Sequence, residues 1–271
     1  MDDYLRGEFS MDSPILNLPA SEPRPIAPSL ENRVVVLTDL SNEDFLQCYA
    51  AAGRVGLSGG VTLIDKAINR AQRHLDERHL WGSWSHAFIF QGRRHDDHHW
   101  VMESDLQIHR KHIQLGTQEN RISKYYDEDF YTTLAVLDFA LPAEQVAALL
   151  CEGLELVANR AKYSMRELLG TLIALHDPKL RGRDNPLARE KSMYCSAFVR
   201  QVFRKIGLDL APGIHGKNTT PEDIARTKIP HTTYLLKREL PESKLAKLKG
   251  QLRGRVRARL EILKRSRSHR L

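Results

Sequence analysis

Apolar and polar residues follow two different patterns along the chain, one that predicts strands and one that predicts helices. Short apolar or alternating runs predict strands at 33–40, 85–90, 100–104, 131–139 and 231–240. Stretches in which apolar residues recur every three or four positions predict helices at 41–54, 61–75, 143–161, 163–175 and 194–207, with a capped helical turn at 219–225. Because these elements follow no regular strand–helix–strand order, the pattern favours an α+β fold with an antiparallel sheet packed against helices.

Residues with special backbone preferences predict where several elements begin and end. Ser41 is a helix N-cap residue, and Pro142 opens the helix that follows it. Gly207 ends the helix at 194–207, and residues 176–192 form a polar loop before it. A break in secondary structure is predicted by three glycines, Gly56, Gly59 and Gly60.

The strands at 85–90 and 100–104 are separated by a polar, turn-like segment and therefore predict a β-hairpin. If the turn is centred between residues 94 and 95, Phe90 faces His99 and Phe88 faces Val101. The same register places His86 opposite Glu103, where directly opposed Cβ atoms are about 5 Å apart. A carboxylate in that position can hold one imidazole nitrogen and leave the other free.

Proline and charge divide the chain into three parts. Residues 1–32 hold five of the twelve prolines and predict an extended or disordered arm. Residues 33–240 contain the predicted elements and form the folded domain. Residues 241–271 form a basic segment whose leucines recur at helical spacing, which predicts an amphipathic helical tail.

The positive charge of the chain belongs to this tail. Residues 242–271 carry eleven Lys or Arg and two Glu, a charge of +9, so the other 241 residues carry −2 of the total of +7. A basic tail can bind an acidic protein, an anionic lipid surface or nucleic acid, or it can simply be solvated. The tail has no aromatic residue for base stacking, and the body shows no nucleic-acid-binding motif, which argues against nucleic-acid binding as the main function.

Composition limits the class of protein. The chain has 271 residues, 41% hydrophobic and 28% charged, which is the balance of a globular protein with a sizeable core. Three cysteines are too few for a disulfide framework and indicate a reducing compartment. The first residues are acidic and lack an apolar segment, and no run is long enough to span a membrane. We therefore expect a cytoplasmic protein, with export by a specialised secretion system as the alternative.

One cysteine stands where a nucleophile would be activated. Cys195 lies in the first turn of the predicted helix at 194–207, where free N–H groups and the helix dipole favour a thiolate. With His86 as base and Glu103 orienting it, Cys195 completes an activated-nucleophile arrangement. Asp105 and Gln107 lie on the same strand face as Glu103 and are the alternatives for the third position. The plainer interpretation of a lone cysteine is core packing, which we expect for Cys48 and Cys151.

A metal site is a competing interpretation. The segment HDDHH at 95–99 gathers three histidines and two aspartates, and His109 and His112 follow it. Residues of one turn rarely converge on a single ion, and the sequence has no HExxH motif, so we expect no metal and no cofactor.

The order of several short segments resembles a known family. SHAFIF, VMES, KYSMRELLG, MYCSAFVRQVF and TTPEDIA occur in the order found in the NlpC-type papain-like superfamily, in its circularly permuted branch of YiiX-like and lecithin:retinol acyltransferase-like proteins. The resemblance covers about residues 50–230 and implies a permuted papain-like fold with the nucleophile at a helix N-terminus. It implies Cys195 as nucleophile, His86 as general base and acid, and Glu103 as the residue that orients His86. The chain departs from the family at Ala197, where members often have an acidic residue, and at the poorly matched segment GRVGLSGG.

These observations predict a cysteine hydrolase that acts through an acyl-enzyme on a peptide, isopeptide or cell-wall peptide amide bond. A lipid acyl hydrolase or acyltransferase with the same Cys–His pair is the first alternative. A binding module without catalysis, acting through the basic tail, is the second. The expected partners are a peptide or lipid acyl substrate and, for the tail, an anionic partner, while the oligomeric state stays open.

Overall fold

The computed structural model describes residues 15–18, 25–27, 31–75, 81–109, 112–159, 170–171, 174–175, 178–183 and 193–237. The tail predicted at 241–271 lies outside the described residues, as do most of the helix predicted at 163–175 and most of the loop predicted at 176–192. Within the arm predicted at 1–32, Ile15–Leu18 forms strand β1.

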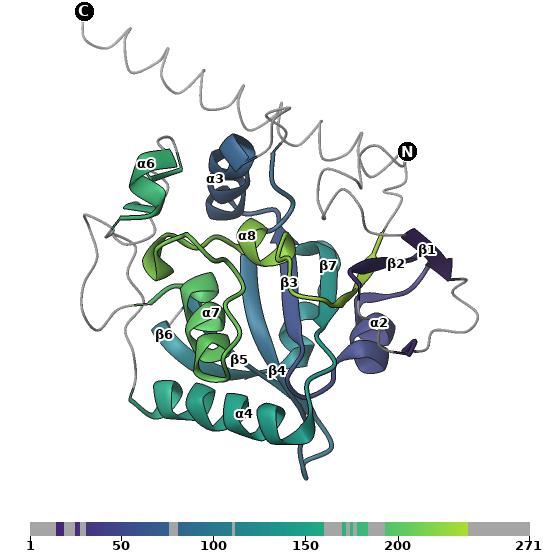
Figure 1. Ribbon diagram of the computed structural model, residues 1–271. Helices are drawn as coiled ribbons and strands as arrows, with labels where there is room; N and C mark the ends of the chain where they lie inside the picture. Colours follow the sequence, from purple (N-terminus) through teal and green to yellow (C-terminus); the bar gives the residue numbers. More distant parts are fainter. Residues whose placement is uncertain are drawn as a thin grey trace, which may run out of the picture. The chain divides into compact units, whose positions relative to one another are not determined.

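Eight strands form one sheet, in the order β1-β2-β8-β7-β3-β4-β5-β6 (Figure 1). The pairs β1–β2 and β2–β8 are parallel, and the remaining neighbours are antiparallel. The fold is therefore α+β, as predicted, with a mostly antiparallel sheet. After β1, the strand bounds are Arg33–Leu37 (β2), Val55–Gly60 (β3), His86–Arg93 (β4), His99–His109 (β5), His112–Arg121 (β6), Tyr131–Asp138 (β7) and Thr232–Leu236 (β8).

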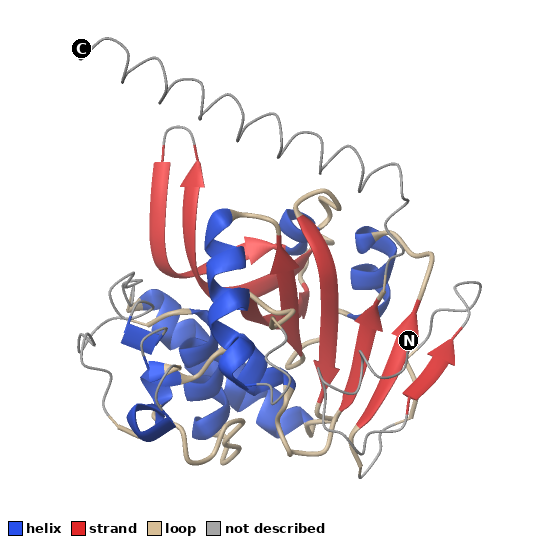
Figure 2. Cartoon of the chain, turned by 90° about the horizontal axis from the view of Figure 1, so that it is seen from above, coloured by secondary structure: helices blue, strands red, loops and turns tan. Residues whose placement is uncertain are grey.

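Helices cover both faces of this sheet (Figure 2). Ala143–Ala158 (α4) and Cys195–Lys205 (α7) pack on one face, where α7 contributes four buried residues to the core, Phe198, Val199, Val202 and Phe203. Asn42–Tyr49 (α2) and the 3-10 turn Ile122–Tyr125 (η2) pack on the other face. The remaining helical segments are Leu63–Gln72 (α3), Arg73–Leu75 (η1), Pro178–Arg181 (α6), Gly216–Asn218 (η3) and Pro221–Ala225 (α8). None of the helices in the described ranges combines the length and the apolar character needed to cross a bilayer.

Side chains cap three of these helices where the sequence places capping residues. The Ser41 hydroxyl accepts a hydrogen bond from the backbone N–H of Asp44 at the start of α2. Thr62 and Thr220 each form a reciprocal capping box, at α3 and α8. Gly207 follows α7 with φ of +83°, a conformation that favours glycine after a helix.

The break predicted from three glycines is wrong, because Gly56, Gly59 and Gly60 lie in strand β3 near the middle of the sheet. At Gly56 the reason is the neighbouring strand: a Cβ atom there would lie 2.2 Å from Cε2 of Phe88. Glycine therefore leaves room for a buried aromatic ring across the strand pair. The sequence pattern does not show this, because the ring that needs the space is remote in the chain.

The predicted hairpin forms, but its register differs by two residues from the prediction. Phe90 pairs with Val101 and not with His99, and Arg93 pairs with His99 around a five-residue tip. A β-bulge between Phe90 and Gly92 leaves Gln91 as an extra residue on β4. The error of two residues preserves the alternation of faces, so His86 and Glu103 still lie on one face of the hairpin.

The close approach at Gly56 gives a test of the packing. In Gly56→Ala the added methyl group meets the Phe88 ring, and we expect the free energy of unfolding to fall by about 1 to 3 kcal/mol. Urea denaturation measures this change. Gly216→Ala is the matched control, since nothing lies within 4 Å of a Cβ there, and it should stay within about 0.5 kcal/mol of the parent. Equal stability of the two variants would contradict the packing argument.

Candidate active site

The structure brings together the three residues that the sequence singled out. Cys195 is the first residue of α7, His86 is the first residue of β4, and Glu103 lies on β5. Nε2 of the His86 ring lies 2.6 Å from Oε2 of Glu103, and the Cys195 thiol is near enough to the ring to raise its pKa. Because Glu103 takes Nε2, Nδ1 is the ring nitrogen left for the thiol.

Hydrogen bonds on either side of Cys195 fix the turn that presents it. The Ser104 hydroxyl on β5 donates to the carbonyl of Met193 at 2.6 Å. The hydroxyls of Tyr194 and Ser196 both donate to the carbonyl of Thr219, at 2.6 and 2.9 Å. These bonds tie the start of α7 to the sheet and to the segment before α8, so the position of the thiol is held from both sides.

The start of α7 differs from the starts of α2, α3 and α8, which side chains cap. Tyr194 occupies the N-cap position in an extended conformation, and no side chain caps the helix. The N–H groups of a first helical turn have no partner within the helix, and the helix dipole favours negative charge near them. Cys195, a residue only 5% exposed, stands at this end of the helix.

His86 lies in an environment that favours its protonated form. Burial lowers its pKa, but this effect is outweighed by the charges of Cys195 and Asp105 and by the hydrogen bonds to Cys195 and Glu103. The net result is a pKa well above the ordinary value of a histidine. The ring is also held by stacking, since its centroid lies 6.4 Å from that of Tyr125 with an interplanar angle of 23°.

Glu103 is fully buried and receives hydrogen bonds from four side chains. Its Oε2 lies 2.6 Å from Nε2 of His86 and accepts from the Tyr125 hydroxyl at 2.5 Å. Its Oε1 accepts from Nδ2 of Asn120 at 2.6 Å and from Nζ of Lys124 at 2.7 Å. Burial raises the pKa of this carboxyl, but the charge of Lys124 and the bond and charge of His86 outweigh burial and lower it strongly. Glu103 is therefore ionised in the folded protein.

Lys124 joins Glu103 to a second carboxylate. Its Nζ lies 2.6 Å from Oδ2 of Asp105, so one ammonium bridges two acidic side chains of β5. Its pKa is raised because these two charges outweigh the effect of burial. Asp105, the first alternative for the third position, thus contacts Lys124, while Glu103 contacts His86. The side chain of Gln107, the second alternative, lies outside the described structure.

The sequence interpretation missed Asn120, Lys124 and Tyr125. Asn120 lies on β6, and the other two lie in η2, which follows it. In the sequence these two residues are a Lys–Tyr pair directly after a strand-like segment. No catalytic or binding motif includes this pair, so the sequence alone does not point to it. Only the pairing of β5 with β6, which puts Glu103 opposite Gln118, brings this segment to Glu103.

The metal interpretation of the HDDHH segment gains no support. In the described part of the chain, the group that could hold an ion is His86, Glu103 and Asp105, whose ligand atoms lie within 4.8 Å of one another. No residue of 95–99 belongs to it. Asp96 and Asp97 instead pair with Arg121 and Arg93 at the hairpin tip. At the His86 group, the Lys124 ammonium already stands between the two carboxylates, so this site carries its own cation.

The other two cysteines differ in their surroundings. Cys48 is half-buried in the core on the α2 face, and burial raises the pKa of its thiol. Cys151 is exposed, so the expectation that it packs in the core is wrong. The buried positions of α4 are Leu149 and Gly153, which shows that the apolar stripe of α4 is wider than the strip that contacts the sheet.

Comparison with known proteins finds a structural likeness and no sequence relative. No protein-family model matches the chain, and no curated protein matches it. Among solved structures, the fold is similar to the crystal structure of the metalloprotein yiiX from Escherichia coli O157:H7, with a TM-score of 0.43 and 13% sequence identity. The likeness covers 71% of this chain and 99% of that one. Similarity at this level assigns no family.

The role of Lys124 can be tested through stability. Lys124→Met removes the ammonium that lies against Glu103 and leaves a buried carboxylate without that charge. We expect the free energy of unfolding at pH 7 to fall by about 3 kcal/mol or more, as measured by urea denaturation. Lys66→Met, an exposed lysine of α3 with no ion pair to a described residue, is the control and should be near neutral.

The lowered pKa of Glu103 gives a prediction about acid unfolding. A carboxyl with a lowered native pKa adds stability that is complete above its unfolded pKa, about 4.3, and is lost as the pH falls toward the native value. Without Lys124 the native pKa of Glu103 rises, so Lys124→Met should unfold at a higher pH than the parent in an acid titration followed by circular dichroism. Acid midpoints that agree between Lys124→Met and the Lys66→Met control would contradict this.

Proposed function

We propose that this protein is a cysteine hydrolase with a permuted papain-like fold, which cleaves an amide bond through a thioester intermediate. The observation that carries the proposal is that Glu103 holds the His86 ring at Nε2, while the Cys195 thiol lies near enough to raise the pKa of the same ring. A nucleophile, a base and a group that orients the base, each in contact with the next, are the parts that such catalysis needs. The histidine strand precedes the cysteine helix in the chain, which is the order of the permuted branch.

In the first half of the reaction, His86 accepts the thiol proton and Sγ of Cys195 attacks the carbonyl carbon of the substrate. The tetrahedral oxyanion is stabilised by the uncapped N–H groups at the start of α7, including that of Cys195. When the intermediate collapses, the C–N bond breaks and His86 returns the proton to the leaving amine. The acyl group remains on sulfur as a thioester.

In the second half, His86 takes a proton from water while the water oxygen attacks the thioester carbonyl. Collapse of this second intermediate breaks the C–S bond, releases a carboxylic acid and returns the proton to Cys195. Glu103 stays ionised throughout, because its four donors stabilise the carboxylate, and it stabilises the imidazolium that forms at each step. Ester substrates, or an acceptor other than water, would use the same groups.

Loss of the nucleophile tests the proposal directly. Cys195→Ala should abolish turnover across a panel of peptide, isopeptide, cell-wall peptide and lipid ester substrates while the circular dichroism spectrum stays that of the parent. Cys151→Ala, which changes an exposed cysteine outside the site, should keep the parent rate. Unchanged hydrolysis in Cys195→Ala would reject the proposal.

Thiol labelling at pH 7 provides a test that needs no substrate. Accessibility alone would order the rates as Cys151, then Cys48, then Cys195, because these thiols are exposed, half-buried and buried. An activated Cys195 should instead react with iodoacetamide on the order of tenfold faster than the others, as measured by peptide mass spectrometry.

The base should control that labelling rate. His86→Ala should slow the modification of Cys195, whereas His98→Ala at the exposed hairpin tip should leave it unchanged. Rates that follow accessibility in the parent would favour a binding module that has kept the arrangement without its chemistry.

A further inference from the structure

Two hydroxyl groups beside the nucleophile are bound to one backbone carbonyl. Tyr194 and Ser196, the neighbours of Cys195, donate to the carbonyl of Thr219 at 2.6 and 2.9 Å. Thr219 is fully buried and lies just before α8, which begins at Pro221. A shift at the start of α8 would therefore displace the acceptor that holds the turn on both sides of the thiol.

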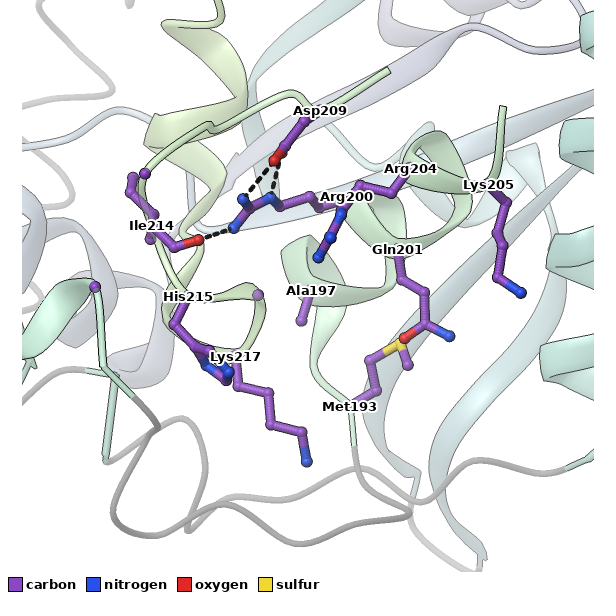
Figure 3. Close-up of a pocket in the computed structure, with 13 residues that line it drawn as sticks. Met193, Ala197, Arg200, Gln201, Arg204, Lys205, Asp209, Ile214, His215 and Lys217 are labelled. Carbon is purple, nitrogen blue, oxygen red and sulfur yellow. Dashed lines mark hydrogen bonds and ion pairs between the residues drawn. The ribbon is translucent and has the colours of Figure 1, made fainter. Parts of the chain in front are cut away.

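Arg200 fixes the segment that precedes α8 against α7. The Arg200 side chain is 3% exposed, and its Nε and Nη2 contact the two carboxylate oxygens of Asp209 at 2.6 and 2.9 Å (Figure 3). Its Nη1 donates to the carbonyl of Ile214 at 2.5 Å and to the hydroxyl of Thr219 at 2.9 Å. Hydrogen bonds from a charged donor are shorter and stronger than those between neutral groups. The nucleophile turn, residues 209–219 and the start of α8 are thus held together as one unit.

Gln72 joins this unit to the segment that leads into His86. It is the last residue of α3 and is only 1% exposed. Its Oε1 accepts from the backbone N–H of Glu222, in the first turn of α8, at 3.1 Å, and its Nε2 donates to the carbonyl of Trp84 at 2.7 Å. Trp84 is fully buried and lies two residues before His86. One amide therefore connects the unit that holds Cys195 to the segment that places the base.

A glycine leaves the space that this amide needs. A Cβ atom at Gly82 would lie 2.8 Å from Nε2 of Gln72 and 3.1 Å from Oε2 of Glu222. The backbone N–H of Gly82 also donates to the carbonyl of Asn69 in α3, at 3.0 Å. The segment before His86 can therefore pack directly against α3 and the Gln72 amide.

A buried amide bonded at both of its ends fixes the spacing of the elements that it joins. Hydrogen bonds constrain both distance and direction, and a fully satisfied buried network makes its surroundings rigid. An apolar side chain of the same size would fill the space but would let the elements slide. Catalytic groups have to be held within about 0.5 Å of their productive geometry, so this spacing matters for a thiol and a ring that exchange a proton.

We propose that Gln72 is a positioning residue that sets the distance between Cys195 and His86. It acts through the backbone of Glu222 on one side and the backbone of Trp84 on the other. The proposal rests on the hydrolase function proposed above, because only a site that transfers a proton between these two groups depends on their alignment.

Gln72→Met tests this role, because methionine has a similar length and removes both hydrogen bonds. At pH 7 ionisation of the thiol depends on its alignment with His86, and we expect iodoacetamide to modify Cys195 on the order of fivefold more slowly than in the parent. At pH 10 thiols ionise without a base, so the rate should equal that of the parent. Peptide mass spectrometry measures both rates on the full-length chain.

Two further variants complete the experiment. Gln47→Met makes the same change in α2, where the amide donates to the Tyr126 hydroxyl at the surface, and it should keep the parent rates at both pH values. Gly82→Ala retains the Gln72 side chain but displaces its amide, and it should repeat the slower rate at pH 7. Circular dichroism checks the fold of each variant, and Gly82→Ala decides the question if Gln72→Met does not fold.

Equal rates at pH 7 in the parent and in Gln72→Met would overturn the positioning role. A change of the same size at pH 7 and pH 10 would also overturn it, because such a change reports the accessibility of the thiol and not its alignment. Failure of the hydrolase proposal has a different signature, since Cys195 of the parent would then already react at the rate that its accessibility sets.

Discussion

The candidate site depends on one buried charge, the carboxylate of Glu103. A carboxylate removed from water is stable only if charged and polar partners replace its hydration. Here four side chains from three different elements do so, and each is placed by its bond to the same group. His86 is one of the four, so the position and charge of its ring follow from the need of the buried Glu103 carboxylate for hydrogen-bonded partners. Stability and proposed chemistry therefore rest on the same interaction.

The site lies where the two layers of the fold meet. Glu103, Tyr125 and Phe88 belong to the face that packs against α2 and η2. Cys195 belongs to the helix that covers the opposite face through Phe198 and its neighbours. The contact between Cys195 and His86 connects these layers at the beginning of β4. Neither core alone assembles the site, which explains why residues so distant in the chain are required for it.

Local patterns in the sequence predicted much of this arrangement. A capping residue predicted the start of α2, helical periodicity predicted the start of α7, and the hairpin pattern predicted the shared face of His86 and Glu103, because these features depend on neighbours in the chain. The strand that contains Gly56 was not predicted, because the reason for a glycine there is the space needed by the Phe88 ring on another strand. The donors Asn120, Lys124 and Tyr125 were missed because only the pairing of β5 with β6 brings them to Glu103. The exposed position of Cys151 was missed because an apolar stripe does not show how much of it the sheet covers.

The bulge at Gln91 restricts how the hairpin can change in length. Below it, residues of β4 and β5 pair so that His86 and Glu103 project to the same side. Continuing the register found above the bulge would instead pair Glu103 with Ile89, which faces the α7 layer. Pairing Gln91 into the ladder, or losing or gaining one residue between Gln91 and His86, would therefore turn the histidine and the carboxylate to opposite sides of the sheet without altering either side chain. Insertions and deletions should thus be tolerated at the tip, residues 94–98, and excluded between Gln91 and His86.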